Sequence, residues 1–384
     1  MYFDLCSIQP GGLLLLQKTG SYLLFIGLVL FSACSQTNTR TALPAFYYWK
    51  TTLALLPSER AYLDSLSCKK VYVKVLDIGR DQGTGKIVPL SRLNLTDTTG
   101  LTGLRLVPTV FITNEVFKGI SEEELEELVK RLNSAPDPKG EGIAAPRSFR
   151  GGVETGEAEL QFDCDWTPST RAVYFSFLQK IKKQLPSGIH LSATIRLHQY
   201  KFPKTTGVPP VERGMLMFYN TGDIDDLGEV NSIFQPEAAR KYLKGAPAHY
   251  PLPLDLALPL FSWTLVFRDE ALWKIIPEFP HDDLRDTTRF EPLTKGTMPF
   301  SSSHWKVRKG TFVSGHYLRL GDLLRRESIS PELLLQAAQL AADMDLADDA
   351  TVAFFHLDSA IIRRYPVQLI DSVWQTIQFG SRKK

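Results

Sequence analysis

The 384-residue sequence has few cysteines, almost no net charge and no apolar run of membrane-spanning length. Of its four cysteines, Cys68 and Cys164 lie next to or within apolar segments, so we predict small core residues and a fold that does not depend on disulfides. The 44 Lys and Arg residues against 42 Asp and Glu give a formal charge of +2. This balance excludes the strong positive field of a nucleic-acid-binding protein, so we expect no nucleic-acid partner.

The first residues are typical of an export signal rather than of a folded domain. Lys18 precedes the apolar run 22–31, which is too short for a comfortable transmembrane helix, and small residues at 32 and 33 lead to Cys34. The alternative is an uncleaved N-terminal anchor. We assign no structural role to residues 1–17.

The block Leu30-Phe31-Ser32-Ala33-Cys34 resembles the lipobox of bacterial lipoproteins. The resemblance implies cleavage before Cys34, which makes residues 1–33 a signal peptide, and acylation of Cys34. Residues 34–44, polar and rich in Thr, would then be a tether. We expect a protein held by a lipid anchor in the bacterial cell envelope, on the periplasmic side or the outer-membrane surface.

Eight short apolar runs alternate with helical patterns over residues 45–384, which predicts a (β/α)8 TIM barrel. The predicted strands are 46–50, 70–77, 108–113, 159–165, 191–199, 214–220, 254–262 and 351–359. The predicted helices are 58–67, 121–133, 169–185, 236–243, 331–344 and 366–378.

Two connections depart from the ideal barrel pattern. The link 199–213 contains three prolines and predicts a loop rather than a full helix. The stretch of about 268–349 between the seventh and eighth strands predicts an inserted subdomain, with a β-hairpin around Lys309-Gly310.

The segment 161–167, Gln-Phe-Asp-Cys-Asp-Trp-Thr, ends the fourth predicted strand with two carboxylates. Side chains alternate along a strand, so Gln161, Asp163 and Asp165 share one face and the apolar residues share the other. The fifth strand repeats this pattern, with polar residues at 192, 194, 196 and 198. Unpaired buried charge is costly, so the polar face must line a solvated or chemically active cavity.

Active sites of TIM barrels lie at the carboxyl ends of the strands, where polar and aromatic residues gather in this sequence. The predicted catalytic carboxylates are Asp163, Asp165, Asp358, Glu115 and Asp77. The predicted ligand-binding residues are Trp49, Arg196, His198, Gln199, Tyr219, Asn220, Trp263 and His356.

We predict Asp165 as the proton donor, with a pKa raised by its neighbour Asp163. A second carboxylate, Asp77, Glu115 or Asp358, would activate water or act as the nucleophile. Trp166 is a further stacking candidate that would instead pack on the helices if it lies on the outer face.

Each assignment has a structural alternative. Asp163 could order the barrel by pairing with Arg196, the histidines could be satisfied core residues, and the tryptophans could pack the core. A metal site built from Asp163, Asp165, Asp358 and the histidines at 198 and 356 lacks any tight ligand spacing such as His-x-His. We therefore expect neither a metal nor a cofactor.

Three segments resemble counterparts in the chitinase-like family 18 glycoside hydrolases, namely 162–165, Met217-Phe218-Tyr219-Asn220 and 256–260. From Phe46 to its end, the chain is also similar to lipoproteins of the Bacteroidetes type with a glycosidase-like barrel, notably in 165–171 and 191–199. The resemblance implies a glycoside hydrolase acting on a polysaccharide or glycoconjugate by carboxylate acid/base chemistry. The alternatives are a non-catalytic glycan-binding barrel and a structural or partner-binding lipoprotein.

The pattern of that family is Asp-x-Asp-x-Glu, in which the Glu protonates the glycosidic oxygen and the preceding Asp assists the acetamido group of the substrate. Asp163 and Asp165 match the two aspartates, but Thr167 stands at the Glu position. Asn220 stands where those enzymes usually carry Asp. Because Thr cannot be a general acid, either another acid has taken the role or the barrel binds without cutting.

Overall fold

The computed structural model describes residues 41–133, 158–293 and 303–380, all within one compact unit, Thr39–Lys384. Eight parallel strands form a closed barrel, because the first strand pairs with both the second and the last. This is the predicted TIM barrel, and each predicted run overlaps one barrel strand. In chain order the strands are β1 (Leu43–Tyr48), β3 (Lys70–Arg80), β6 (Arg105–Ile112), β7 (Ala158–Asp163), β8 (Ile189–Arg196), β9 (Arg213–Met217), β10 (Leu254–Pro259) and β18 (Thr351–Phe355).

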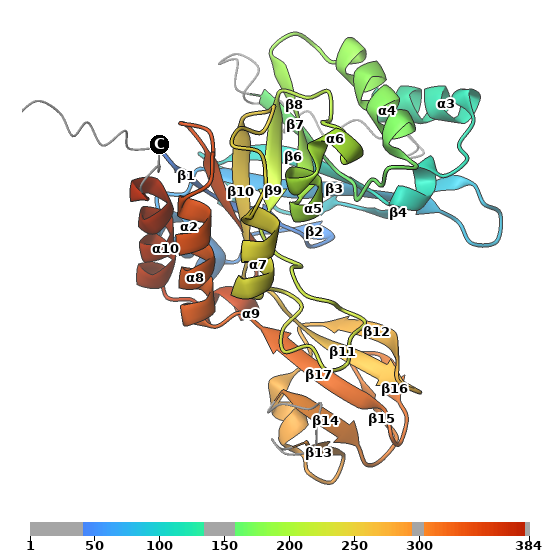
Figure 1. Ribbon diagram of the computed structural model, residues 1–384, viewed down its shortest axis with the longest axis vertical. Coiled ribbons are helices and arrows are strands. Elements are labelled where there is room, and N and C mark those ends of the chain that lie inside the picture. The colour runs from blue at the N-terminus through green and yellow to red at the C-terminus, as the bar shows by residue number, and fades with distance from the viewer. Residues whose placement is uncertain (1–40, 134–157, 294–302, 381–384) are drawn as a thin grey trace, which may run out of the picture. The chain divides into compact units, whose positions relative to one another are not determined.

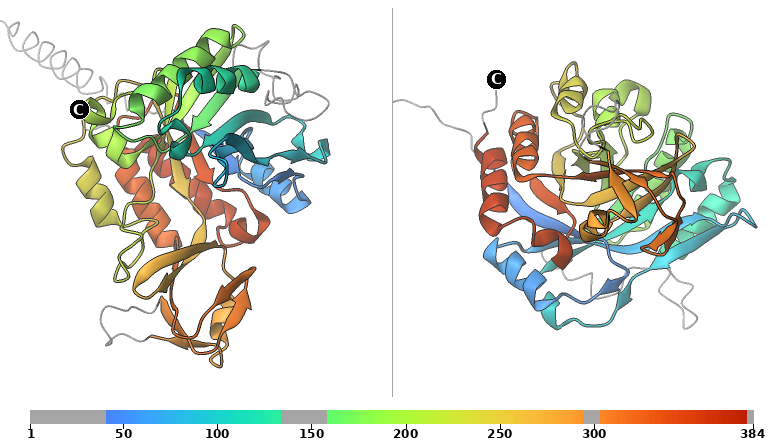
Figure 2. Two further views of the ribbon diagram at one scale, coloured as in Figure 1. Left: turned by 90° about the vertical axis from the view of Figure 1, so that its right-hand side faces the viewer. Right: turned by 90° about the horizontal axis from the view of Figure 1, so that it is seen from below.

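Helices cover the outside of the barrel (Figures 1 and 2). They are α2 (Pro57–Ser65), α3 (Glu122–Asn133), α4 (Arg171–Gln184), α5 (Leu197–Lys201), α6 (Pro203–Thr206), α7 (Pro236–Leu243), α8 (Pro331–Ala342), α9 (Ser359–Ile362) and α10 (Val367–Phe379). Short elements complete the barrel domain: β2 (Thr52–Leu53), β4 (Ile87–Arg92), β5 (Asn94–Leu95), η1 (Thr99–Leu101) and η2 (Asn114–Phe117). No helix of the described residues has the length and apolarity needed to cross a membrane.

Local signals explain where several helices begin. The Ser121 hydroxyl accepts from the backbone N–H of Glu124 at 3.2 Å, and the Glu124 carboxylate accepts from the Ser121 N–H at 3.0 Å, which forms a capping box before α3. The link 199–213, predicted as a loop, contains α6 and the end of α5. Pro203 fits the first turn of α6, and Gly207, with φ 78°, ends it.

The apolar faces of the strands pack against the helices. Phe162 contacts Phe177 of α4 edge-to-face at 5.1 Å, and Trp166 stacks on Tyr174 at 5.4 Å. Trp166 therefore faces the helices. Cys164 lies on the same face, and both it and Cys68 are free and buried, as predicted.

The opposite faces point into the barrel and carry polar groups. The Tyr47 hydroxyl donates to the Gln161 side chain across the barrel at 2.7 Å, and the rings of Tyr47 and Tyr72 stack at 4.9 Å. The predicted polar face of β7 is thus the inner face.

Paired charges fill the amino-terminal part of the barrel interior. The Lys70 ammonium lies 2.8 Å from the Glu159 carboxylate, and the Arg213 guanidinium contacts both Asp255 oxygens at 2.9 and 3.0 Å. Burial is the largest influence on Glu159 and would raise its pKa, but the charge and hydrogen bond of Lys70, the Ser192 hydrogen bond and the Arg105 charge together lower that pKa. For Asp255, burial wins over Lys70 and Arg213 and raises the pKa to about 6.

An antiparallel sheet is inserted late in the barrel, between β10 and β18. Its strands are β11 (Ser262–Arg268), β12 (Ala271–Pro277), β13 (Phe290–Pro292), β14 (His304–Val307) and β17 (Leu323–Ser328), with η4 (His281–Arg285) and the hairpin β15 (Thr311–Val313) and β16 (His316–Leu318). The sheet begins at Ser262 rather than near residue 268, because apolar residues continue from β10 through Leu260 and Phe261 into β11 and the sequence pattern shows no boundary there. α8 packs on α7 and α10 and so belongs to the outer layer of the barrel.

The hairpin turn lies at Ser314-Gly315 rather than at the predicted Lys309-Gly310. Ser314 has φ 48° and Gly315 has φ 78°, and two consecutive positive φ values suit the tight turn of a two-residue hairpin. Gly310 instead lies beside the Tyr317 hydroxyl, where a Cβ atom would come within 2.3 Å of that oxygen.

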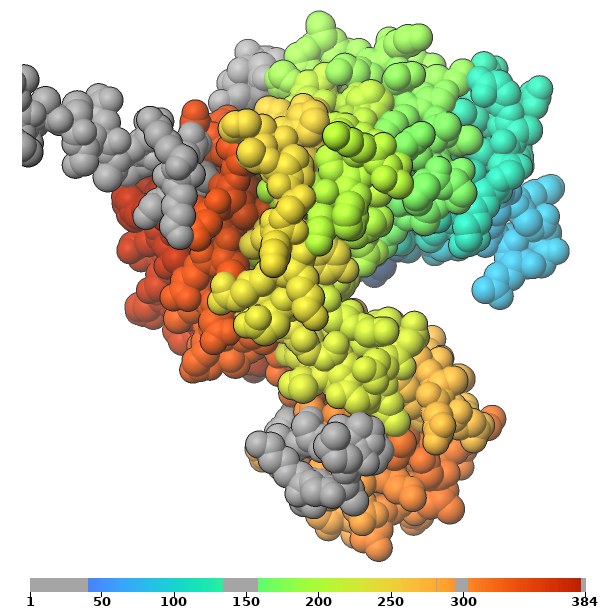
Figure 3. All heavy atoms as spheres, viewed as in Figure 1, coloured from blue at the N-terminus to red at the C-terminus, as the bar shows by residue number. Residues whose placement is uncertain are grey.

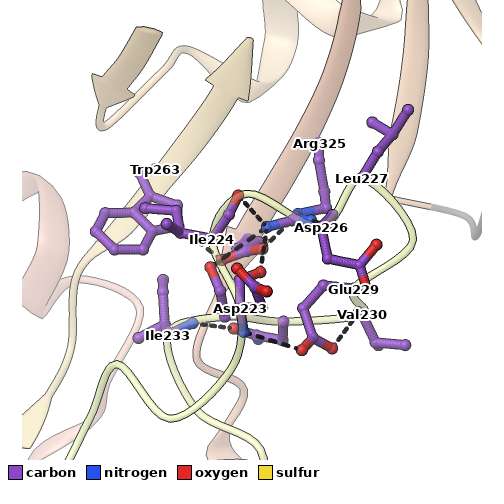
Figure 4. Close-up of polar contacts among 12 residues, drawn as sticks. Asp223, Ile224, Asp226, Leu227, Glu229, Val230, Ile233, Trp263 and Arg325 are labelled. Atoms are coloured by element: carbon purple, nitrogen blue, oxygen red, sulfur yellow. Dashed lines mark hydrogen bonds and ion pairs between the residues drawn. The ribbon is translucent and has the colours of Figure 1, made fainter. Parts of the chain in front are cut away.

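The β9–α7 loop, residues 218–235, packs against this insert (Figure 3) and contacts Arg325 of the insert (Figure 4). Arg325 and Glu327 on β17 have side chains 0% exposed, and Nε of Arg325 lies 2.6 Å from Glu327 Oε1. The guanidinium donates to backbone oxygens of the loop at Asp223, Ile224 and Asp226, the first two at 3.4 and 3.2 Å.

The carboxylate of Glu327 also accepts hydrogen bonds from neighbouring groups. Glu327 Oε2 accepts from the Ser232 hydroxyl and from the Trp263 indole, both at 2.7 Å. The Asn231 amide adds a bond to the Ser328 carbonyl at 2.9 Å. These contacts therefore fix the loop to the insert.

Replacing Arg325 by Met should lower the free energy of unfolding by about 3–5 kcal/mol, because Glu327 would keep a buried charge without its cation. Chemical denaturation followed by circular dichroism measures this loss. The matched control is Arg285→Ala, which removes an exposed arginine and should change stability by less than about 0.5 kcal/mol. An Arg325 variant as stable as the control would contradict the role given to the pair.

Candidate functional site

The two aspartates of β7 lie at the carboxyl-terminal end of the barrel, which we call the mouth. Asp163 is the last residue of β7, and the neighbouring β8 ends at Arg196. The Thr194 hydroxyl donates to Asp163 Oδ1 at 2.7 Å, and the Arg196 guanidinium pairs with the Asp165 carboxylate. Arg196 therefore pairs with Asp165 and not, as the structural alternative had it, with Asp163.

The two carboxyls have different surroundings. Asp163 is 6% exposed, whereas the Asp165 side chain is 45% exposed. Burial, followed by the charge of Asp165, raises the pKa of Asp163 to about 7, although the Thr194 bond and the Arg196 charge oppose the shift. The raised pKa thus belongs to Asp163, whereas the sequence led us to expect it for Asp165, because strand closure buries the first aspartate and leaves the second accessible.

Aromatic rings form a continuous row beside these carboxyls. Trp49 contacts Phe355 at 5.1 Å, Phe355 contacts Tyr219 at 6.0 Å, and Phe261 links Tyr219 at 5.8 Å to Trp263 at 5.2 Å. Burial and then the Asp163 charge raise the pKa of the Tyr219 hydroxyl, which places this hydroxyl near the carboxyls.

The predicted residues Trp49, Tyr219 and Trp263 thus belong to one row. Phe261 and Phe355 were not predicted. The alternation of side chains along a strand could have identified both, because each lies two residues beyond an inward-facing residue of its strand.

A second carboxylate, Asp77, faces the same interior. Its Oδ2 accepts from the Lys74 ammonium at 2.8 Å, and its Oδ1 is buried with no hydrogen-bond partner among the described residues. The charge of Asp77 also contributes to the raised pKa of Asp163, so the two carboxyls are close enough to interact. Lys74, which also lies 5.3 Å from the Trp49 ring, was not predicted, although it follows Tyr72 on the inner face.

The side chains of three predicted site residues are bound to other groups of the protein. They are Gln199, Glu115 and Asp358. Gln199 accepts from the Arg196 backbone N–H at 2.8 Å and donates to the Trp166 carbonyl at 2.9 Å, so its amide holds the strand ends together. The side chain of Glu115, which lies on η2, is 63% exposed and pairs with Lys118.

Asp358 caps α9 and pairs with Lys50 at 3.0 Å. Burial would raise its pKa, but the bonds from Lys50 and from the Ala360 N–H outweigh burial and lower it. The Asp358 carboxylate is therefore held at the N-terminus of α9.

The remaining predicted residues lie around the mouth. His198, on α5, is half-buried, and burial followed by the Arg196 charge lowers its pKa. Burial likewise lowers the pKa of His356, whose Nδ1 has no partner in the described chain. Asn220 has a left-handed backbone, with φ 55°, and a buried Oδ1 without a described partner.

Residue 167, where the family pattern has Glu, is Thr. The Thr167 hydroxyl lies 2.9 Å from the Ser169 hydroxyl and 3.3 Å from that of Thr170, at the start of α4. Across the described ranges, no group of three or more His, Cys, Asp or Glu side chains is arranged to hold a metal ion. Cys34 lies outside the described residues.

The raised pKa of Asp163 predicts a pH-dependent stability. The folded protein binds a proton that the unfolded chain, with an Asp pKa near 3.9, releases, so the free energy of unfolding should fall as the pH rises from about 4 to about 7. Asp163→Asn should reduce that slope by up to about 1.4 kcal/mol per pH unit in urea denaturation. Asp81→Asn, at an exposed site, is the control, and equal slopes for wild type and Asp163→Asn would refute the shift.

No protein-family model matches this sequence, and no curated protein matches it. Among solved structures, it is similar to the spore cortex-lytic enzyme SleL of Bacillus cereus, with 13% identity, a TM-score of 0.46 and coverage of 89% of this chain and 75% of that one. A chitinase of Bacteroides thetaiotaomicron gives 10% identity, a TM-score of 0.47 and coverage of 88% and 97%.

Proposed function

We propose that this barrel is a glycoside hydrolase that acts on a polysaccharide or glycoconjugate, with Asp163 and Asp165 as its acid/base pair. The observation that carries the proposal is a buried carboxyl with a pKa of about 7 beside an accessible carboxylate paired with Arg196. Two carboxyls whose surroundings favour the protonated form of one and the ionised form of the other are typical of an acid/base pair.

Proton transfer assigns a role to each carboxyl. Near neutral pH a large fraction of Asp163 carries a proton, which it donates to the glycosidic oxygen as the bond to the anomeric carbon breaks. Asp165, oriented by Arg196, accepts a proton from the water that attacks that carbon. Return of this proton to Asp163 restores the starting state.

The surroundings of the pair suit a sugar. The flat rings of Trp49, Phe355 and Tyr219 offer apolar surface to the faces of sugar rings. The unpartnered Oδ1 of Asp77 can accept a hydrogen bond from a sugar hydroxyl, which would satisfy a buried polar atom.

Replacing Asp165 by Asn should lower reducing-end release at least about 10²-fold while glycan affinity changes little, because only proton transfer is lost. Asp163→Asn should do the same and also remove the loss of activity as the pH rises through about 7. The matched control is Asp358→Asn, whose carboxylate is engaged by Lys50 and should leave release near wild type. The assay compares the variants on a panel of bacterial and host polysaccharides.

The second candidate function is a non-catalytic glycan-binding barrel, and the hydroxyl at residue 167 is the observation that favours it. In that case no glycan is cleaved, and wild type and both aspartate variants bind the same glycan equally well. Release lost in the Asp165→Asn protein contradicts this alternative.

We also propose that Cys34 is the lipidated first residue of the mature protein, which rests on the lipobox-like block 30–34. A lipid anchor would hold the barrel at a membrane of the cell envelope. Cys34→Ala should abolish cleavage and acylation, so that mass spectrometry finds residues 1–33 still attached and no acyl chain. Ser35→Ala is the control, and an acylated N-terminal fragment from the Cys34→Ala protein would contradict the proposal.

A further inference from the structure

Exposed apolar side chains gather on the outer part of the insert. Phe312 and Tyr317 occupy opposite positions on β15 and β16, their rings 5.0 Å apart, and they are 71% and 48% exposed. Leu320, just after the hairpin, is 71% exposed, and Trp273 on β12 is 41% exposed. Figure 1 shows β12 and this hairpin in the insert, away from the barrel helices.

One arginine joins the two parts of this surface. The Arg268 guanidinium lies 3.8 Å from the Trp273 ring centroid, donates to the Tyr317 carbonyl at 3.5 Å and pairs with Asp322 at 2.8 Å. Trp273, Phe312, Tyr317 and Leu320 therefore form one surface, which we call the hairpin patch.

The chain around the hairpin patch is positively charged. Residues 305–321 include four exposed cations and no acid, and no ion pair of these cations is found among the described residues. The four are Lys306, Arg308, Lys309 and Arg319. Glu291 on β13 lies opposite Lys306, so Arg308, Lys309 and Arg319 remain for an external anion.

The acids next to the hairpin patch in the sequence lie at its border. Asp322 is engaged by the Arg268 side chain and by the Arg319 backbone N–H at 2.8 Å. Asp269 and Glu270 form the exposed turn between β11 and β12 at the Trp273 side. Positive charge is thus concentrated on the hairpin half.

The hairpin patch is attached on the same side of the barrel as the candidate site. The insert follows the carboxyl-terminal end of β10, and Asp163 ends β7 in the same parallel barrel. Leu43, where β1 begins, lies at the opposite end of the strands. A polymer that leaves the mouth can therefore continue over the insert.

We propose that the hairpin patch binds an acidic polysaccharide, with sugar faces packed on Trp273 and Tyr317 and with carboxylate, sulfate or phosphate groups contacting Arg308, Lys309 and Arg319. This inference rests on the proposed function, because it names the class of glycan that the barrel would take. Exposed aromatic and cationic side chains together match a ligand with both apolar ring faces and negative charge.

The test is affinity electrophoresis of the purified chain in gels that contain polygalacturonate or uncharged dextran. Mobility should fall in polygalacturonate only, and this retardation should weaken in high salt, which screens exposed charges. The triple variant R308Q/K309Q/R319Q should bind polygalacturonate about tenfold more weakly. Trp273→Ala should weaken it with the net charge unchanged.

The matched control is K183Q/K204Q/K244Q, which removes three exposed cations elsewhere and should retain wild-type affinity. Equal weakening in both triple variants would mean that net charge alone is sensed, and retardation by dextran or by neither polymer would equally overturn the proposal. Sedimentation with phosphatidylglycerol vesicles that depends on the patch cations, without polygalacturonate binding, would assign the patch to a lipid surface instead.

A parallel assay separates this inference from the proposed function. Reducing-end release from short soluble oligosaccharides should be unchanged in R308Q/K309Q/R319Q, because these positions lie outside the mouth. Retardation by polygalacturonate should be unchanged in Asp163→Asn. If no glycan is cleaved but retardation still depends on the patch cations, the catalytic proposal fails and the binding surface stands.

Discussion

Closing eight parallel strands into a barrel forces every inward side chain into a small, poorly solvated volume, and charge placed there must find a partner. In the amino-terminal part this condition is met by Lys70 with Glu159 and by Arg213 with Asp255, at 2.8 and 2.9 Å. Polar residues therefore occur on strands whose outer faces are wholly apolar. Burying one member of such a pair without its partner would cost several kcal/mol of folding free energy. Each member therefore depends on its partner and on the register that aligns their strands.

The mouth departs from this rule, and that departure makes it the candidate site. Asp163 has a hydroxyl donor, Thr194, but its nearest opposite charge, Arg196, is committed to Asp165. The result is a carboxyl that keeps its proton to about pH 7. Asp77, with one buried oxygen that has no hydrogen-bond partner among the described residues, is another incompletely paired position on the interior. Incomplete polar pairing at the open end of the barrel is where a ligand gains most by binding.

The insert extends this end of the molecule. Arg325 and Glu327 join its sheet to the β9–α7 loop, and Glu327 also holds Trp263 at the end of the aromatic row. The same sheet carries the hairpin patch on its outer part. Under the proposed function, a glycan that enters the mouth would meet the aromatic row first and the cationic hairpin patch beyond it.

The sequence alone determined the eight strands, the six long helices and the two faces of β7, because alternation and helical periodicity are local properties that survive into the fold. It also identified Asp163, Arg196 and Tyr219 as mouth residues, since strand ends can be read from one chain segment at a time. Which groups pair, in contrast, follows from the three-dimensional fold. Contacts such as Arg196 with Asp165, and the burial that raises the pKa of Asp163, depend on neighbouring strands and on distances that no local pattern encodes.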